Sequence, residues 1–371
     1  MSVRILPSSS NSGSEPISPL TAAFQSAVAP TCGILLALAA WGLQKYAFSP
    51  FVSRIAVDVG IAMMLAVSLN IVNGMTGQFS IGHAGFMALG GYAAAMISYY
   101  GSLLLWNAPV KHGGPFGAGE WLFALSCLAG GIVAAGAGYV VGLPSLRLRG
   151  DYLAIVTLGF GEIVRVLLQQ TNDVIKTKAA LQTANWRELI PPPVGGAVGF
   201  NGVPKYTNLF WVCLFLSLTV IVAYRLKRSG IGRSMIAIRE DEVAAYSMGV
   251  NTTRVKVQSF VISAALAGVA GGLYAHESGV IISPMDAGFQ RSFEYVIMTV
   301  LGGNGSVTGV MSAAALLTVL PELLRQFDAY RLIVYSLLLI GMMLVRPQGL
   351  FGFWEIWDWA PRLRRRKGAE G

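Results

Sequence analysis

The stretch from Asn208 to Leu226 reads NLFWVCLFLSLTVIVAYRL and carries no charged side chain before Arg225. A helix rises about 1.5 Å per residue, so about 20 apolar residues cross the hydrocarbon core of a bilayer, which is roughly 30 Å thick. This stretch is therefore long enough and apolar enough to span a membrane as one α-helix. Its basic end favours the cytoplasmic side.

The composition places the whole chain in the same class. Of 371 residues, 54% are hydrophobic and 12% are charged, against roughly 25% charged residues in soluble domains. Mean hydropathy is +0.60, and the apolar residues occur in long runs. These values exclude a disordered chain, a disulfide scaffold and a typical soluble enzyme, and they predict an all-α polytopic membrane protein. The net charge of +9 then favours contact with anionic membrane lipid, and no nucleic-acid partner is expected.

Nine apolar segments are long enough to be membrane spans. They cover residues 30–48, 51–72, 79–99, 121–143, 150–170, 208–226, 257–277, 307–325 and 331–346. The segment Ser292–Gly303 is apolar but too short to cross, and it runs into Gly-Gly-Asn-Gly at 302–305, which predicts a half-helix entering a break. The predicted fold is an all-α bundle of about nine or ten spans, with both termini on one side when the half-helix is counted.

The positively charged residues orient this bundle. With both termini inside, the dense Lys and Arg clusters fall on the cytoplasmic side, as the positive-inside rule requires. This predicts a disordered cytoplasmic tail over 1–29, without a signal peptide, and a transmembrane domain over 30–350. Within that domain, residues 227–256 form a cytoplasmic coupling loop and residues 171–207 an outer loop. The tail 351–371 carries Phe and Trp followed by Arg-Leu-Arg-Arg-Arg-Lys, which favours an interfacial anchor over an unstructured basic tail.

Residue types that bind metals or attack substrates do not group in the sequence. Cys32, Cys127 and Cys213 lie far apart in apolar stretches, which favours buried thiols over a disulfide or a metal site. No GxxxxGK[ST] loop, HExxH motif or GxSxG elbow occurs. We therefore expect no metal, no cofactor and no catalysis, and if the protein works against a gradient, the energy enters from elsewhere.

The cytoplasmic loop holds a short segment with the signals of a helix. Acidic residues come at its start, where they favour the positive end of the helix dipole, and a glycine stands where a C-terminal cap belongs. Between them, Ala244, Ala245 and Met248 predict a small flat face that a groove on another protein could accept. An amphipathic surface loop is the alternative. The residues of this segment are Arg239, Glu240, Asp241, Glu242, Ala244, Ala245, Met248 and Gly249.

This segment resembles the EAA loop of ABC-transporter permeases, the helix that docks in the ATPase subunit. Ala244, Ala245 and Gly249 match its Ala-Ala-x-x-x-Gly spacing. Val243 stands where the signature has Glu, and Glu242 comes one place earlier. The resemblance implies that the segment contacts an ATPase.

Four further motifs resemble the LivM-type permease of branched-chain amino-acid ABC importers. They are Thr76–Phe86, Leu146–Arg165, Val300–Ser306 and Arg346–Gly352. The resemblance runs roughly from Phe51 to Gly352. Two outer segments depart from the family: Val194–Pro204 has Val where the family has Thr, and 173–193 looks like an insertion.

The resemblance implies a type II ABC importer permease and a non-catalytic role. It implies two ATP-binding subunits, a homologous second permease subunit and an extracytoplasmic substrate-binding protein as partners, in the inner membrane of a bacterium. The implied cargo is a branched-chain or other neutral amino acid. Two alternatives stay open: a permease for urea or short amides in the same family, and a stand-alone secondary transporter coupled to protons through His83 or Glu162.

Polar side chains within the predicted spans are candidates for a translocation path, because each is costly in hydrocarbon. Glu162 and Arg165 are three residues apart and share a helix face, so they either pair to fix helix packing or line the path. Six glycines between residues 74 and 91 leave little bulk near Gln78, Ser80 and His83, which favours a cavity wall over packing. The candidates are Gln78, Ser80, His83, Thr157, Glu162, Arg165 and Asn304.

Overall fold

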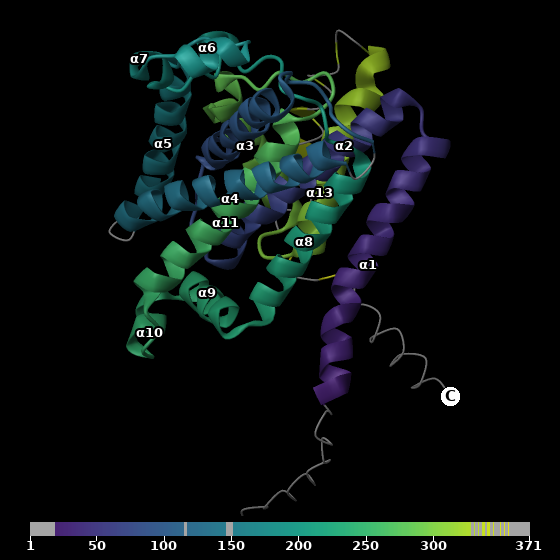
Figure 1. Ribbon diagram of the computed structural model, residues 1–371. Coiled ribbons are helices and arrows are strands. Elements are labelled where there is room, and N and C mark those ends of the chain that lie inside the picture. The colour runs from purple at the N-terminus through teal and green to yellow at the C-terminus, as the bar shows by residue number, and fades with distance from the viewer. Residues whose placement is uncertain are drawn as a thin grey trace, which may run out of the picture.

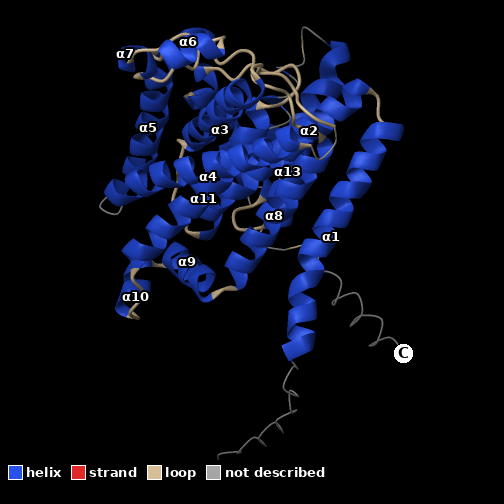
Figure 2. Ribbon diagram, in the orientation of Figure 1, coloured by secondary structure: helices blue, strands red, loops and turns tan. Residues whose placement is uncertain are grey.

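A computed structural model describes residues 19–114, 117–145 and 151–327, with scattered positions between 330 and 355. Helices make up the regular structure of these residues (Figure 2), and two isolated bridges are the β pairing found among them. The predicted all-α class is confirmed. The predicted span 331–346 and the tail 351–371 lie largely outside the described residues, as do residues 1–18 and 146–150.

Six helices of the described part are long and apolar enough to cross a membrane. They are α2 (Pro50–Asn70), which continues into the π-helical turn η1 (Ile71–Met75), α3 (His83–Trp106), α4 (Ala118–Ser145), α5 (Asp151–Gln169), α8 (Leu209–Arg228) and α11 (Thr252–Ala275). Three more helices pack with them: α1 (Pro19–Tyr46), α12 (Phe289–Gly302) and α13 (Val307–Leu323).

Short helices mark the two ends of the bundle (Figure 1). The helices α6 (Lys178–Thr183) and α7 (Trp186–Leu189) lie at one end, and α9 (Gly230–Glu240) and α10 (Glu242–Ser247) lie at the other. Three single turns, η2 (Gly196–Val198), η3 (Pro284–Ala287) and η4 (Leu324–Phe327), connect longer elements. The long helices run between these ends, so the two predicted loops, 171–207 and 227–256, are separated by the length of the bundle.

The first helix begins earlier than predicted. It starts at Pro19, whereas the sequence predicted a disordered tail up to residue 29. Proline suits the first position of a helix because it lacks the backbone N–H that is unbonded there. The following Thr21–Ala29 includes several alanines, the strongest helix formers. The Ser- and Pro-rich composition of the preceding residues concealed this start.

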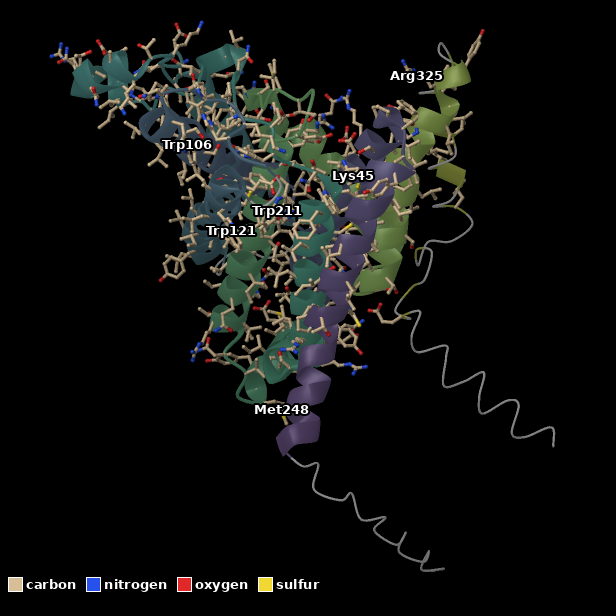
Figure 3. All side chains as sticks on the ribbon, turned by 45° about the vertical axis from the view of Figure 1, so that its right-hand side comes forward. Lys45, Trp106, Trp121, Trp211, Met248 and Arg325 are labelled. Carbon is tan, nitrogen blue, oxygen red and sulfur yellow. The ribbon has the colours of Figure 1, made fainter. Side chains whose placement is uncertain are left out.

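The helices α12 and α13 form a hairpin that enters the bundle partway and returns to the same end. With 14 residues, α12 is about 21 Å long, shorter than a hydrocarbon layer of roughly 30 Å. The chain then turns at Gly303 and Gly305, whose φ angles of 105° and 92° suit glycine. The helix α13 returns toward the α6–α7 end, and Figure 3 shows Arg325, just beyond it, at the end opposite Met248. The predicted half-helix and break are therefore present, and we call residues 303–306 the tip of the hairpin.

The outer surface of the bundle is apolar over its length. On α4, Leu125 and Ile132 are exposed, and on α5, Ile155 and Leu167 are exposed. Exposed aliphatic side chains in such number are unfavourable in water and favourable in lipid. The outer surface of the fold is therefore suited to the hydrocarbon core of a membrane.

Candidate functional site

The helix α10 presents apolar side chains at the α9–α10 end. Asp241 caps it, and one carboxylate oxygen accepts hydrogen bonds from Val243 N (2.8 Å) and Ala244 N (3.0 Å). Gly249 follows the helix with a φ of 84°, as a C-terminal capping glycine does. We call the exposed side chains of this helix and its cap the knob: Val243, Ala244, Tyr246 and Met248, the last 85% exposed.

Two predicted members of this surface lie elsewhere. Ala245 is 5% exposed and belongs to the hydrophobic core, so the predicted face of Ala244, Ala245 and Met248 is corrected at Ala245. The reason is helical geometry: one side of a two-turn helix must bury against its neighbours, and Ala245 is on that side. Glu242 pairs with Lys256 of α11, with Oε1 2.6 Å from Nζ.

Arg239 points into the protein, away from the knob. Its Nη1 donates a hydrogen bond to Gly74 O in η1 (3.0 Å), and its Nη2 pairs with Glu240 Oε1 (2.7 Å). A Cβ atom on Gly77 would lie 2.6 Å from Arg239 Cγ, and one on Gly305 would lie 3.0 Å from Nη1. The side chain therefore lies against the end of α2 and the tip of the α12–α13 hairpin at once.

Two further side chains hold the tip. Asn70 accepts a hydrogen bond from Gly305 N (2.9 Å) and donates one to Ser306 O (3.2 Å). Lys227, at the end of α8, donates to Gly305 O (2.8 Å). Asn304, between the two glycines, is exposed. Asn304, which was predicted as a translocation-path candidate, therefore faces away from the hydrogen bonds that hold the tip.

Glu355 joins this cluster from the C-terminal part of the chain. Its carboxylate accepts hydrogen bonds from Val307 N (3.0 Å) and Thr308 N (3.1 Å), the first free N–H groups of α13, and pairs with Lys227 Nζ (2.6 Å). Burial alone would raise the pKa of Glu355, but the hydrogen bonds from Lys227 and α13 outweigh burial and lower it. We call Asn70, Lys227, Arg239 and Glu355 the clasp.

A cavity of about 730 Å³ opens on the other side of the tip, toward the α6–α7 end. The helices α2, α12 and α13 and the end of α11 enclose it. Charged side chains lie near its mouth: Arg54, Asp58, Arg291, Glu294 and Glu322. Its deeper wall is aliphatic and includes Leu65, Met298 and Leu317, all buried. We call this cavity the vestibule.

One helix connects the vestibule to the clasp. Along α2 and η1, Asp58 lines the mouth, Leu65 the deeper wall, Asn70 holds the tip, and Gly74 accepts the hydrogen bond from Arg239. The clasp therefore lies beyond the deeper wall of the vestibule, farther along the same helix. None of its residues other than Arg239 was among the predicted candidates, because their partners are distant in sequence.

The predicted polar group after the glycine-rich break lies in helix contacts rather than on the vestibule wall. His83 Nε2 is 2.7 Å from Ser68 Oγ, and the His83 side chain is 2% exposed. Ser80 N donates to Asn73 Oδ1 (3.1 Å). Gln78 is 7% exposed, and its Oε1 has no hydrogen-bond partner among the described residues. Other residues line the vestibule. Gln78, Ser80 and His83 therefore lie in helix packing, which was the alternative to a cavity wall.

The polar residues of α5 tie that helix to its neighbours. Glu162 pairs with Arg165, as predicted for positions three apart, and also accepts a hydrogen bond from Phe289 N (3.1 Å), the first residue of α12. Thr157 Oγ1 accepts a hydrogen bond from Ile81 N (3.0 Å). These contacts hold α5 against the starts of α12 and α3, outside the vestibule.

Taken together, an all-α bundle with an apolar exterior, a re-entrant hairpin and a vestibule that opens toward one end has the features of an integral membrane permease. Comparison with known proteins gives the family. Residues 51–345 match the family described as the permease component of the branched-chain amino acid transport system, so the chain belongs to that family. Its relatives are permease subunits and not enzymes, and this chain is likewise a multi-pass transport permease.

The relatives include LivM and LivH permease proteins. The chain is 37% identical over 346 residues to the high-affinity branched-chain amino acid permease LivM of Salmonella typhimurium, covering 86% of this chain and 74% of the relative. It is 36% identical over 347 residues to LivM of Escherichia coli, with the same coverage. It is also 27% identical over 302 residues to the permease LivH of Salmonella typhimurium, covering 79% of this chain and 92% of the relative. No solved structure matches the chain. The predicted LivM-type resemblance is confirmed.

Proposed function

We propose that this chain is a permease subunit of an ABC importer for branched-chain or other neutral amino acids, coupled through the knob to ATP-binding subunits. The observation that carries the proposal is the continuous connection from the knob to the vestibule. The knob on α10 is joined to α9 by a single residue, Asp241, and Arg239 of α9 bonds directly to η1 at Gly74. A displacement of the knob therefore acts on the clasp.

The proposed assembly has two ATP-binding subunits at the α9–α10 end and a substrate-binding protein at the α6–α7 end. The α9–α10 end is then cytoplasmic, and so are both termini. The relatives include both LivM and LivH proteins, which supports a homologous second permease subunit as the direct partner. The apolar exterior of α4 and α5 is available to that subunit and to lipid, in the inner membrane of a bacterium.

In the proposed cycle the substrate enters the vestibule from outside and is stopped by the clasp. ATP-driven closure of the ATP-binding subunits moves the knob, and α9 carries Arg239 away from Gly74 and the tip. Interfaces of this kind switch between two packed arrangements rather than deforming gradually. Loss of the Arg239 contact frees the tip, and the vestibule opens to the cytoplasmic side.

Replacing Gly249 by Trp tests the role of the knob. In this chain nothing lies within 4 Å of a Cβ placed on Gly249, so a large side chain there projects into the space of a docked subunit. We expect the ratio of amino-acid uptake to ATP hydrolysis to fall by about tenfold or more, because lost docking contacts of roughly 1.4 kcal/mol correspond to tenfold. The measurement is uptake and ATP hydrolysis by the complete transporter, with its binding protein, in proteoliposomes.

The matched control is Gly249→Ala. Both variants place a side chain at a φ of 84° and so share the backbone strain of a non-glycine residue there. They differ in bulk, and Ala should retain most of the coupling. If the Trp variant transports as much per ATP as the Ala variant, the docking role of the knob is wrong.

A further inference from the structure

Glu277 is a buried carboxyl group without a hydrogen-bond donor. It lies two residues after the end of α11, is 2% exposed, and neither of its oxygens receives a hydrogen bond from the described residues. An unpaired buried carboxylate is costly. Its position therefore calls for a hydrogen-bond donor that the described residues around it do not supply.

The neighbour of Glu277 is a second carboxyl group, Asp58 of α2. The two side chains lie within hydrogen-bond reach of each other, and two carboxyl groups can share a hydrogen bond only when one of them holds a proton. The nearest cations do not neutralise the pair directly. Lys205 Nζ already donates to Ala275 O (3.2 Å) and Val280 O (2.5 Å), and Arg54 forms no ion pair within 4 Å in the described structure.

Asp58 connects this pair to the vestibule. Asp58 lines the cavity, and its neighbour Glu277 is not among the lining residues. Arg54 is one helical turn earlier on α2, on the same face, and also lines the mouth. The vestibule thus presents the Asp58 carboxyl group, with the buried Glu277 carboxyl group next to it, the Arg54 guanidinium, and a deeper aliphatic wall that includes Leu65 and Leu317.

We propose that Asp58 and Glu277 bind the ammonium group of a zwitterionic aliphatic amino acid in the vestibule, with Arg54 facing its carboxylate and its side chain against the aliphatic wall. This inference rests on the proposed function and adds to it the chemistry of recognition. A single ammonium cation supplies donors to the oxygens that lack them and balances the second negative charge. A neutral amide or urea has N–H donors but no positive charge to balance the second carboxylate, so the site selects amino acids over these compounds.

Competition on the unaltered protein tests this directly. The assay is equilibrium binding of radiolabelled leucine to the detergent-purified complete transporter, without its binding protein. Unlabelled 3-methylbutylamine carries the cation and the branched apolar group, and 4-methylpentanamide carries a similar apolar group without the charge. We expect the amine to compete at least about tenfold better than the amide, since a hydrogen bond between charged groups is stronger than one from a neutral amide. Equal competition by the two compounds, or no specific binding of leucine, overturns the proposal.

Two variants and a matched control assign the effect to these residues. Asp58→Asn and Glu277→Gln should each weaken leucine binding about tenfold or more, and Asp58→Glu should restore much of it. Asp173→Asn removes an exposed carboxylate from the loop at the same end of the bundle and should leave binding unchanged. Unaltered binding in both Asp58→Asn and Glu277→Gln contradicts the proposal. ATP-driven uptake by the unaltered transporter, measured separately, tests the proposed function itself.

The pH dependence of leucine binding distinguishes direct binding of the ammonium group by Glu277 from a purely structural role of this residue. Burial and the neighbouring Asp58 raise the pKa of Glu277 to about 8. The other charged groups that act on the pair are Arg54 on α2, Lys205 before α8, Arg291 on α12 and Glu322 on α13. Below pH 8 the ammonium must displace a proton, so leucine affinity should fall by up to about tenfold per pH unit as the pH decreases. Glu277→Gln should remove this slope, and a slope unchanged in that variant overturns the assignment.

Discussion

Arg239→Ala is expected to lower ATP-driven uptake about tenfold or more while the transporter still assembles and hydrolyses ATP. The substitution removes the hydrogen bond to Gly74 O and the side chain that packs between Gly77 and Gly305. A hydrogen bond from a charged group contributes about 1.5–3 kcal/mol, which corresponds to roughly tenfold to more than a hundredfold in an equilibrium. Without it, the tip is released even when the ATP-binding subunits are open, so ATP-driven motion of the knob no longer controls the opening of the vestibule.

Two controls separate this role from general damage to α9. Arg233 lies on the same helix with an exposed side chain, so Arg233→Ala should transport normally. Arg239→Lys keeps the charge but loses the planar fork that bonds η1 and Glu240 together, and should recover coupling only in part. Uptake per ATP hydrolysed, measured in proteoliposomes, distinguishes the variants. Normal coupling in Arg239→Ala would remove the proposed link between α9 and the clasp.

The structural features that depend on residues close together in the chain were predicted from the sequence. Runs of about 20 apolar residues predicted the long helices, and the break at Gly303 and Gly305 followed from glycines after a short apolar segment. The cap of α10 was similarly visible, because acidic residues before a helix and glycine after it act within one turn. Each of these signals involves residues close in the chain.

The clasp depends on contacts that the sequence does not mark. Arg239 and Gly74 are 165 positions apart, and Lys227 and Glu355 are 128 apart. Nothing in the spacing of these residues predicts their meeting, and Arg239 was assigned to the docking surface only because it precedes the knob. A sharper signal was available for Asn70, since an amide this deep in an apolar span requires a partner.

The glycines near His83 show where the same pattern has two structural meanings. Small residues on a helix leave room either for a cavity or for another backbone, and we expected a cavity here. In the structure that room is filled by other helices: a Cβ on Gly82 would lie 2.0 Å from Thr157 O, and one on Gly90 would lie 2.2 Å from Gly268 Cα. Only the position of the partner helix separates the two readings.

The tightest of these contacts should make Gly271→Val one of the most damaging substitutions in the chain. On α11, a Cβ at Gly271 would lie 1.9 Å from Met87 O and 3.0 Å from Gly91 N on α3. Both are backbone atoms, which no side-chain rotation can move away, so α3 and α11 must separate. Overpacking of a close contact costs about 1–3 kcal/mol and sometimes more, and here the cost should reach the upper part of that range or exceed it. Thermal unfolding in detergent and the yield of monodisperse protein measure the loss.

The separation would also affect transport, because α11 contacts η1 and borders the vestibule through Tyr274. Gly136→Val on α4 is the matched control: nothing lies within 4 Å of a Cβ at that position, and removing a helical glycine gains backbone rigidity. This variant should unfold at the temperature of the unaltered protein or slightly above it. Equal unfolding temperatures for the two valine variants would show that the close approach of α3 and α11 is absent, and with it the rigid frame against which the hairpin tip is proposed to move.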